Sequence, residues 1–258
     1  VKQLVRVKPE NHTAYDLVLQ GLEYHRKSNV TLENAKKAVE FFDQAIEVDP
    51  NCARAHAWRA CSLSNYVGWR PDEYGEDWID QCADSVIRSL EIDQNDHEAN
   101  RIMGAISLVR GDFELARHHQ ERAMELCPSD AYIMGKNAAL LVYLGEPEKA
   151  LEIVQHAMRI NPFCPDDLFV DEGMCYFWLG KYSEAVNCFR KMKTPDRESV
   201  FYLTASLSKL GEGIKSAETL KQAFKMTDLS VEDFLLTQHY QNPELKQELR
   251  EILESIPI

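Results

Sequence analysis

The sequence of 258 residues lacks several features on which large classes of proteins depend. No run of about 18 apolar residues occurs and no stretch has the pattern of a secretory signal peptide, so we expect no segment to enter a membrane. Positive charge is scarce, because 29 Lys and Arg stand against 42 Asp and Glu, for a net charge of -13. Surfaces that neutralise phosphates or lie on anionic lipid need the opposite balance. We therefore expect no nucleic-acid partner.

Motifs of known catalytic chemistry are missing as well. There is no glycine-rich phosphate loop, no H-E-x-x-H sequence and no Ser-His-Asp order. One acidic cluster resembles paired acid-base carboxylates, but it follows Pro165, where it is expected to open a helix and to favour the positive end of the helix dipole. Its members are Asp166, Asp167, Asp171 and Glu172. We expect a protein that is not an enzyme and has no cofactor.

Metal ligands are not grouped at metal-binding spacing. His118 and His119 are adjacent, and adjacent side chains on a helix project about 100° apart, so we expect a solvated pair. The cysteines form no C-x-x-C pair, and an odd, dispersed set is typical of small buried side chains in a reducing compartment. We expect a cytoplasmic chain without a metal or a disulfide. The seven cysteines are Cys52, Cys61, Cys82, Cys127, Cys164, Cys175 and Cys188.

The feature that organises the chain is a 34-residue repeat between residues 97 and 164. A fixed set of small residues and a proline recurs at this spacing, whereas an ordinary helical bundle has no reason to keep one period. A period of this length, with Val-x-Gly or Leu-Gly at a fixed offset, resembles the tetratricopeptide repeat, which has two antiparallel helices per unit. The recurring residues are Gly104, Ala116, Ala123 and Pro128, then Ala138, Ala150, Ala157 and Pro162.

Helix packing explains this pattern. Gly104 and Ala116 are expected to face each other within one hairpin, which lets the two helix axes approach closely. Ala123 lies two turns along the same face and is expected to receive the first helix of the next unit. Pro128 cannot continue a helix, so each unit ends cleanly.

The repeat predicts an all-α fold, a right-handed α-solenoid of about six helix pairs with C-terminal capping helices. The segments 1–13, 14–228 and 229–258 are expected to be a linker, the solenoid and the capping helices. Thr31 is expected to cap a helix. Ser230 and Asp233 resemble a capping box for a helix through about Tyr240, and Asn242-Pro243 starts a final helix. The expected units are about 14–52, 53–96, 97–130, 131–164, 165–195 and 196–228.

The second unit contains an insert at residues 64–80 that carries four large aromatic side chains. Such a segment either packs over the repeat as a cover or presents a binding surface, and both interpretations stay open. The four are Tyr66, Trp69, Tyr74 and Trp78.

Three stretches of the chain resemble one group of proteins. They are RVKPENHTAYDLVLQGLEYHRK at the start, the VGW and RPD sequences of the insert, and DFLLTQHYQNPELKQELREIL near the end. Together they resemble the C-terminal tetratricopeptide-repeat region of bacterial class III adenylate or guanylate cyclases and of related winged-helix regulators. The chain has no cyclase aspartate pair and no winged-helix segment, so neither activity is assigned to it. Because Val1 is not Met, we expect a piece of a longer protein, and the resemblance implies a bacterial signalling protein.

In this repeat family the first helix of each unit lines the concave face, and the resemblance therefore implies a partner-binding groove. Its aromatic side chains provide contact area at low entropic cost, and its cations can hold a carboxylate. The alternative is that several of these aromatics pack between units. The groove residues are Arg54, Trp58, Arg101, Tyr132, Lys136, Tyr143, Met174, Phe177, Trp178, Phe201 and Tyr202.

The expected function is a non-catalytic scaffold that binds a protein segment, or a second copy of itself, and so regulates an attached domain. Some repeats of this family hold the C-terminal carboxylate of chaperones through Lys and Asn, but apolar or acidic residues such as Leu22 and Glu98 occupy those positions here. The alternative function is a small-ligand sensor in which residues 64–80 close over a pocket and modulate an attached cyclase or DNA-binding domain.

Overall fold

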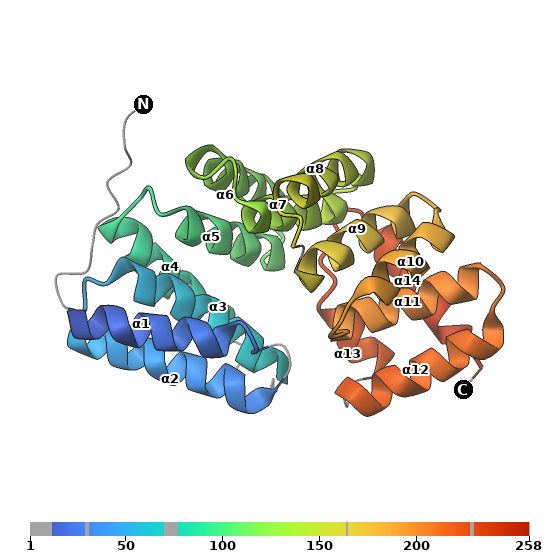
Figure 1. Cartoon of the computed structure of the whole chain (residues 1–258), viewed down its shortest axis with the longest axis horizontal. Helices are drawn as coiled ribbons and strands as arrows, with labels where there is room; N and C mark the ends of the chain where they lie inside the picture. Colours follow the sequence, from blue (N-terminus) through green and yellow to red (C-terminus); the bar gives the residue numbers. More distant parts are fainter. Residues whose placement is uncertain (1–11, 29–30, 70–76, 164, 228–229, 258) are drawn as a thin grey trace. The chain divides into compact units, whose positions relative to one another are not determined.

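The computed structural model describes residues 12–28, 31–69, 77–163, 165–227 and 230–257, and within them it shows fourteen α-helices and no strand (Figure 1). The chain divides into two compact units, Val1–Cys127 and Pro128–Ile258. The first unit holds α1 (His12–His25), α2 (Leu32–Val48), α3 (Ala53–Trp69), α4 (Trp78–Ile92), α5 (His97–Val109) and α6 (Phe113–Leu126). The second holds α7 (Ala131–Tyr143), α8 (Pro147–Ile160), α9 (Asp166–Trp178), α10 (Tyr182–Lys191), α11 (Arg197–Lys209), α12 (Gly213–Thr227), α13 (Val231–Leu236) and α14 (Pro243–Glu254).

Within each unit the helices form hairpins that stack on one another. In the first unit α1 packs against α2, α3 against α4, and α5 against α6, while α3 also contacts α1 and α5. In the second unit the hairpins are α7–α8, α9–α10 and α11–α12, and α9 contacts both α7 and α11. The first helices of successive hairpins therefore lie side by side and form the inner face of each unit. The predicted all-α solenoid of helix pairs with C-terminal capping helices is confirmed.

Close approach within a hairpin depends on the small residues that the repeat conserves between its copies. A Cβ atom added to Gly104 would lie 3.2 Å from the backbone oxygen of Ala116, so α5 and α6 meet at this point as predicted. Ala116 and Ala123 have no exposed surface, and neither do Ala138 and Ala150 in the next hairpin. A larger side chain at these positions has to push the two helices apart.

The turn inside a hairpin needs a left-handed residue. Asp112 donates its backbone N–H to the carbonyl of Ser107, which closes the end of α5 in the way that requires positive φ at the intervening Gly111. An L side chain is strained there, whereas glycine is not. Four turns share this geometry, at Gly111, Gly145, Gly180 and Gly211, with φ of 76°, 80°, 71° and 77°.

Helix starts were largely predictable from capping residues. The side chain of Thr31 accepts a hydrogen bond of 3.2 Å from the backbone of Asn34, which confirms it as the cap of α2. Pro165 precedes the first residue of α9, so Asp166 and Asp167 occupy the first turn as expected. The predicted linker 1–13 lies mostly outside the described residues, and α1 begins at His12, two residues before the predicted solenoid start.

The C-terminal helices also follow their caps. Ser230 and Asp233 form the predicted capping box, and Asn242 caps α14 through the backbone of Glu244. However, α13 ends at Leu236 and not near Tyr240. Residues 238–242, between α13 and α14, are therefore not helical.

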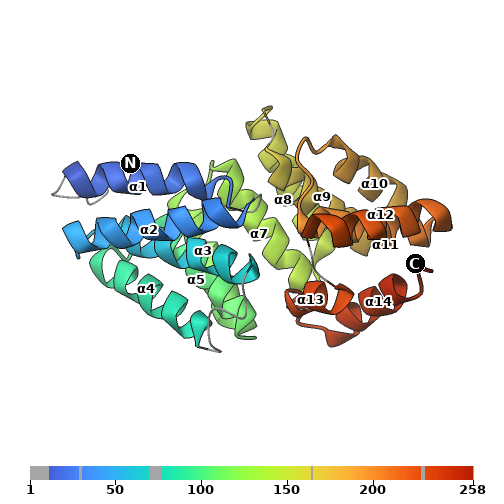
Figure 2. The same ribbon diagram turned by 90° about the horizontal axis from the view of Figure 1, so that it is seen from below.

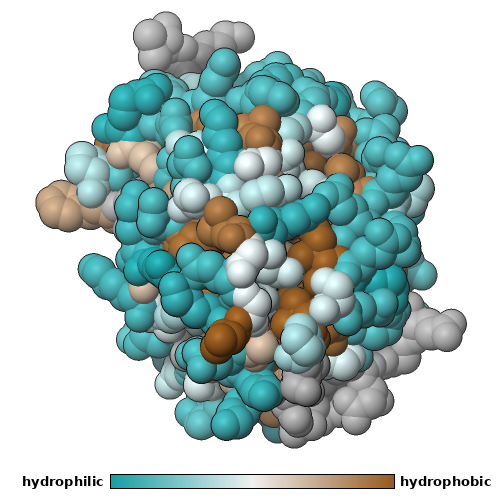
Figure 3. Space-filling model, turned by 90° about the vertical axis from the view of Figure 1, so that its right-hand side faces the viewer, coloured by the Kyte–Doolittle hydropathy of each residue, from teal (hydrophilic) through white to brown (hydrophobic). Residues whose placement is uncertain are grey.

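The C-terminal helices pack on one side of the last hairpin. Figure 2 shows α11 between α12 and the pair α13–α14, and α11 contacts all three helices. Apolar surface remains visible among hydrophilic side chains at this end of the second unit (Figure 3). Ile214 at the start of α12 is 80% exposed. The capping helices therefore protect the inner side of α11 and leave the outer hairpin surface in solvent.

We expect Gly173→Ala to destabilise the protein. The added methyl would clash with the ring of Phe189, which is buried in the core. Alanine gains about 1 kcal/mol of helix propensity, but forcing an extra carbon into a packed core costs more, so the net loss should be about 1 to 3 kcal/mol in urea unfolding.

Gly213→Ala is the matched control. A Cβ at Gly213 meets nothing within 4 Å, so this change should be neutral or should stabilise by up to about 1 kcal/mol. Equal effects of the two substitutions would contradict the packing account.

Candidate functional site

The inner face of the first unit carries three of the predicted groove residues, on α3 and α5. Trp58 is 7% exposed, and the edge of its ring meets His25 at 4.8 Å between centroids. The guanidinium of Arg101 lies 5.6 Å from the Trp58 ring, and its Nε donates to Glu98 Oε2 at 2.7 Å. Arg54 is partly exposed one turn before Trp58. The structure thus brings Trp58 and Arg101 together and leaves Arg54 beside them on α3.

The indole N–H of Trp58 has an unusual environment. Its Nε1 is buried, and no hydrogen-bond acceptor reaches it among the described residues. A buried donor without an acceptor costs about 1 to 3 kcal/mol, so the group is suited to an acceptor from a bound molecule.

Two neighbours of Trp58 were missed by sequence reasoning. Cys61 Sγ lies 3.8 Å from His25 Nε2 and 3.8 Å from Arg101 Nη2, and it is partly exposed. The sequence separates these three residues by about 40 positions each, and the repeat period that brings α1, α3 and α5 together was the only available signal.

The second unit presents Tyr132 and Lys136 on α7. The Lys136 ammonium lies 5.4 Å from the Tyr132 ring centroid and 3.5 Å from Asp167 Oδ2 of α9. Both side chains are partly exposed. The positive charge of Lys136 is thus already matched by a carboxylate of the same unit.

Tyr143, Trp178 and Tyr202 bind a segment of their own chain. The Trp178 Nε1 donates to Tyr240 Oη at 2.9 Å, and the hydroxyl of Tyr202 is paired with the same oxygen. Tyr202 Oη also donates to Gln238 Oε1 at 3.0 Å.

The backbone of this segment is held as well. Gln241 donates its backbone N–H to the carbonyl oxygen of Tyr143 at 2.9 Å, and the Tyr240 ring packs 5.0 Å from the ring of Tyr143. Residues 238–241 thus lie across α7, α9 and α11. The inner face of the second unit is occupied by a non-helical piece of the chain itself.

The remaining three groove residues belong to the core. Met174, Phe177 and Phe201 have at most 2% of their surface exposed, and Phe201 stacks on Phe234 of α13 with centroids 4.3 Å apart. Tyr202 is also fully buried. For these residues the alternative of packing between helices describes the structure, and α13 covers the α11 face that carries Phe201.

Carboxylates lie under this inner face of the second unit. Tyr143 Oη donates to Glu198 Oε1 at 2.8 Å, and burial raises the pKa of Glu198. Asp171 is 3% exposed, its Oδ2 has no hydrogen-bond partner among the described residues, and burial raises its pKa to about 8. The sequence predicted that the acidic cluster interacts with the positive end of the helix dipole. This is wrong for Asp171, because it lies beyond the first turn of α9 and is buried.

Other predicted features fall outside an exposed groove. His118 is exposed, but His119 is half-buried and its Nδ1 pairs with Asn100 at 3.1 Å, so only one member of this pair is solvated. Tyr66 and Trp78 of the aromatic insert pack in the core of the first unit. The side chain of Trp69 and the whole of Tyr74 lie outside the described residues, as does Cys164.

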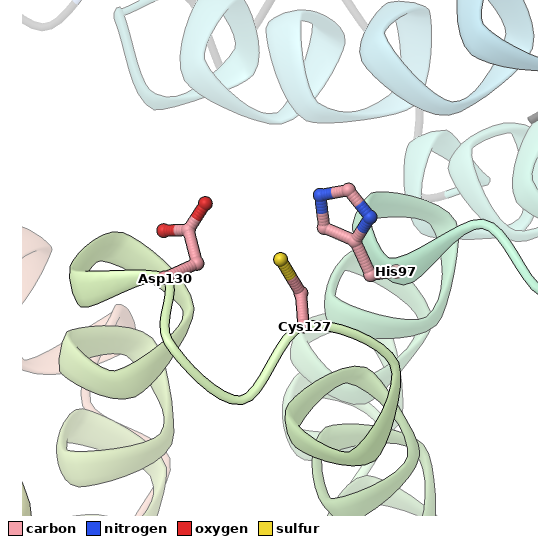
Figure 4. Close-up of side chains that lie close together, drawn as sticks. All are labelled: His97, Cys127 and Asp130. Carbon is pink, nitrogen blue, oxygen red and sulfur yellow. The ribbon is translucent and has the colours of Figure 1, made fainter. Parts of the chain in front are cut away.

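Figure 4 shows the side chains of His97, Cys127 and Asp130. The carboxylate of Asp130 accepts hydrogen bonds from the backbone of Tyr132 at 2.8 Å and of Ile133 at 3.2 Å, so it serves as the cap of α7. Asp130 belongs to the second compact unit, and His97 and Cys127 belong to the first. Two residues within one unit do not make a metal site.

No helix in the described part of the chain is long and apolar enough to cross a membrane.

Comparison with known proteins supports the repeat assignment. Residues 28–52 match the family model of the tetratricopeptide repeat. The chain is 28% identical over 106 residues to mouse DnaJ homolog subfamily C member 7, a match that covers 40% of this chain and 20% of that protein. It is 25% identical over 209 residues to Tetratricopeptide repeat protein 37 of Xenopus laevis, which covers 79% of this chain and 12% of that protein. The chain thus spans a fifth or less of the length of these relatives.

A solved structure shows the same fold. The crystal structure of a tetratricopeptide-repeat protein of Thermus thermophilus is similar with a TM-score of 0.57, 14% identity, and coverage of 81% of this chain and 99% of that one. The predicted tetratricopeptide repeat is confirmed. Proteins with this repeat generally mediate protein-protein interactions as scaffolds.

We expect Tyr240→Phe to destabilise the second unit. The change removes the oxygen that pairs with Tyr202 and accepts from Trp178 Nε1, and it leaves the Trp178 N–H without its acceptor. The expected loss in urea unfolding is about 1 to 3 kcal/mol. Leu236→Ala, at a side chain 62% exposed, is the control and should change little. A neutral Tyr240→Phe would show that residues 238–241 are only loosely held.

We expect the effect of Asp171→Asn to depend on pH. The folded-state pKa of Asp171 is raised to about 8, above the value of about 3.9 in an unfolded chain, so the folded state holds the extra proton between these values. Stability of the wild type should therefore fall as pH rises through this window.

Urea unfolding at pH 4.5 and pH 8 measures this dependence. Between pH 4.5 and pH 8 the wild type should lose on the order of 3 kcal/mol more of its unfolding free energy than Asp171→Asn does, because Asn carries no proton to lose. Parallel stability curves for the two proteins would show that Asp171 is ionised when folded. The charged groups nearest to it are Lys136, Asp167, Asp196 and Glu198.

Proposed function

We propose that this chain is a non-catalytic interaction scaffold whose first unit binds a protein segment on its inner face, at Arg54 and Trp58 of α3. The observation that supports this most directly comes from the second unit. There, residues 238–241 already lie in a non-helical form across three first helices. The inner face of this repeat array therefore has the chemistry to hold a peptide.

Side-chain chemistry indicates which kind of segment fits the first unit. Arg54 and Trp58 are four residues apart on α3 and so lie on one face of the helix. Arg54 forms no ion pair with a described residue, whereas Arg101 is paired with Glu98 at 2.7 Å. Arg54 is thus the cation that can hold a carboxylate of the partner, and the unpartnered indole N–H of Trp58 can donate to a carbonyl. An acidic peptide segment is the partner that this face fits.

The regulatory role, the cellular setting and the self-association of the chain remain predictions. Regulation of an attached cyclase or winged-helix domain rests on the resemblance of three sequence stretches, as does a bacterial, cytoplasmic signalling role. Self-association of the chain is a further prediction. The alternative role as a small-ligand sensor has less support, because Tyr66 and Trp78 of the insert pack into the core, which favours the cover interpretation.

Selection from a random peptide library on the purified full chain tests the proposal. Selected peptides should be enriched in Asp and Glu, and fluorescence anisotropy should show affinity lost about tenfold in Arg54→Gln, as expected for one charged hydrogen bond. Trp58→Phe should weaken binding by a similar factor, because it removes the indole N–H and keeps an aromatic ring at this position.

Arg88→Gln is the matched control. Arg88 is an exposed arginine on α4, in the second helix of the same hairpin, and its loss should leave the affinity unchanged. Equal losses for Arg54→Gln and Arg88→Gln would indicate binding by net charge alone and would contradict the inner-face site.

A further inference from the structure

We propose that Cys61 is a reactive thiolate and a modification site, which undergoes thiol-disulfide exchange with small anionic disulfides at the inner face of the first unit. The site goes beyond peptide binding, because the reactivity of the sulfur needs no bound peptide. Three helices build it: α3 supplies the sulfur, α1 supplies His25 and α5 supplies Arg101.

Two basic side chains flank the sulfur. His25 Nε2 and Arg101 Nη2 each lie 3.8 Å from Cys61 Sγ. On its other side the His25 ring is held by Ser62, whose Oγ lies 2.9 Å from Nδ1. With Nδ1 donating to that oxygen, Nε2 is the nitrogen that accepts the proton of the thiol. This arrangement is that of a cysteine activated by an adjacent base.

The electrostatic balance at the sulfur favours the thiolate. Burial by itself raises the pKa of Cys61, but the charges and hydrogen bonds of His25 and Arg101 outweigh burial and bring it to about 6. Glu98 faces the site through its ion pair with Arg101, and Cys82 faces it from α4. The carboxylate of Glu98 reduces the effect of Arg101 but leaves that of His25.

Four other described cysteines have the opposite environment. Burial raises the pKa of Cys52, and it raises that of Cys82 and of Cys188 to about 12. The pKa of Cys175 is raised as well. Buried thiols of this kind are inert, because the thiolate is the reacting species. Among the cysteines with a shifted pKa, Cys61 is therefore the one poised to react, and it is partly exposed.

Neighbouring groups indicate the class of reagent. Arg54, Trp58 and Cys61 occupy positions i, i+4 and i+7 of α3, so they follow one face of the helix. The indole N–H of Trp58 is buried without an acceptor, and the Trp58 ring contacts both His25 and Arg101. A disulfide that carries carboxylates provides an acceptor for this N–H and a charge partner for Arg54.

The exchange step is balanced without another oxidant. The thiolate of Cys61 attacks one sulfur of the disulfide RS–SR, the new Cys61–S–S–R bond forms, and the old S–S bond breaks. The leaving RS⁻ carries away the electron pair and takes a proton from water. The adduct lies on the same face of α3 as the peptide site proposed above.

Alkylation by limiting iodoacetamide, followed by peptide mapping by mass spectrometry, measures the thiolate directly in the full chain. The alkylation rate of Cys61 should follow a titration with its midpoint near pH 6. At pH 6.5 about three quarters of such a thiol is ionised, against about 1% of an ordinary thiol, and the lower nucleophilicity of the more acidic thiolate cancels about tenfold of this difference. Cys61 should therefore react about sevenfold faster than an ordinary thiol.

Partly exposed Cys127 serves as the internal reference in the same sample. His25→Gln and Arg101→Gln should each move the midpoint of Cys61 upward and slow its reaction at pH 6.5, with circular dichroism showing that the helices remain. A wild-type midpoint of 8 or higher overturns the proposal without any variant. A midpoint that neither substitution moves overturns it as well.

Glutathione disulfide is the probe for the exchange. After incubation at pH 7, one glutathionyl group should be found on Cys61 before any other cysteine, and Arg54→Gln should slow its addition while leaving the iodoacetamide rate unchanged. Modification spread evenly over the cysteines, or absent from Cys61, contradicts the assignment. This readout does not depend on whether the chain binds a peptide.

Discussion

The close contact between the two helices of each hairpin is the constraint on which the rest of the structure depends. Gly104 approaches the Ala116 backbone so closely that a Cβ would lie 3.2 Å from its oxygen, and the corresponding alanines of the next hairpin are fully buried. This contact fixes the separation of paired helices and sets first helices beside one another. The inner faces that carry Trp58 and Tyr143 exist only because this packing repeats.

The inner faces of the two units differ in whether their polar groups have partners within the chain. In the second unit, residues 238–241 satisfy Trp178, Tyr202 and the backbone of Tyr143, so the polar groups that line the face are used inside the chain. In the first unit, the Trp58 N–H lacks an acceptor among the described residues and Cys61 lies between two basic groups. A buried donor without an acceptor costs stability, and a thiol between two basic groups is a candidate for reaction. The inner face of the first unit is therefore the candidate functional surface.

The balance between burial and local charge decides the behaviour of the ionisable groups. Asp171 and Glu198 lie below the inner face of the second unit, and their pKa values are raised because few donors replace the water they lose. At Cys61 the same burial is outweighed by His25 and Arg101. At Cys188, by contrast, burial and the adjacent carboxylate of Glu172 raise the pKa of the thiol. Reactivity therefore follows from which helices meet, not from the cysteine itself.

The sequence alone determined the hairpin architecture, because helix period, capping residues such as Thr31 and Ser230, and left-handed glycines such as Gly111 act over a few residues. Tertiary structure decided the rest. Residues about 40 positions apart, such as Cys61 and His25, meet only when hairpins stack, and no local pattern encodes their distance. The burial of Phe201 likewise depends on α13 folding back onto α11, a long-range contact whose free energy comes from apolar area that neither segment buries alone.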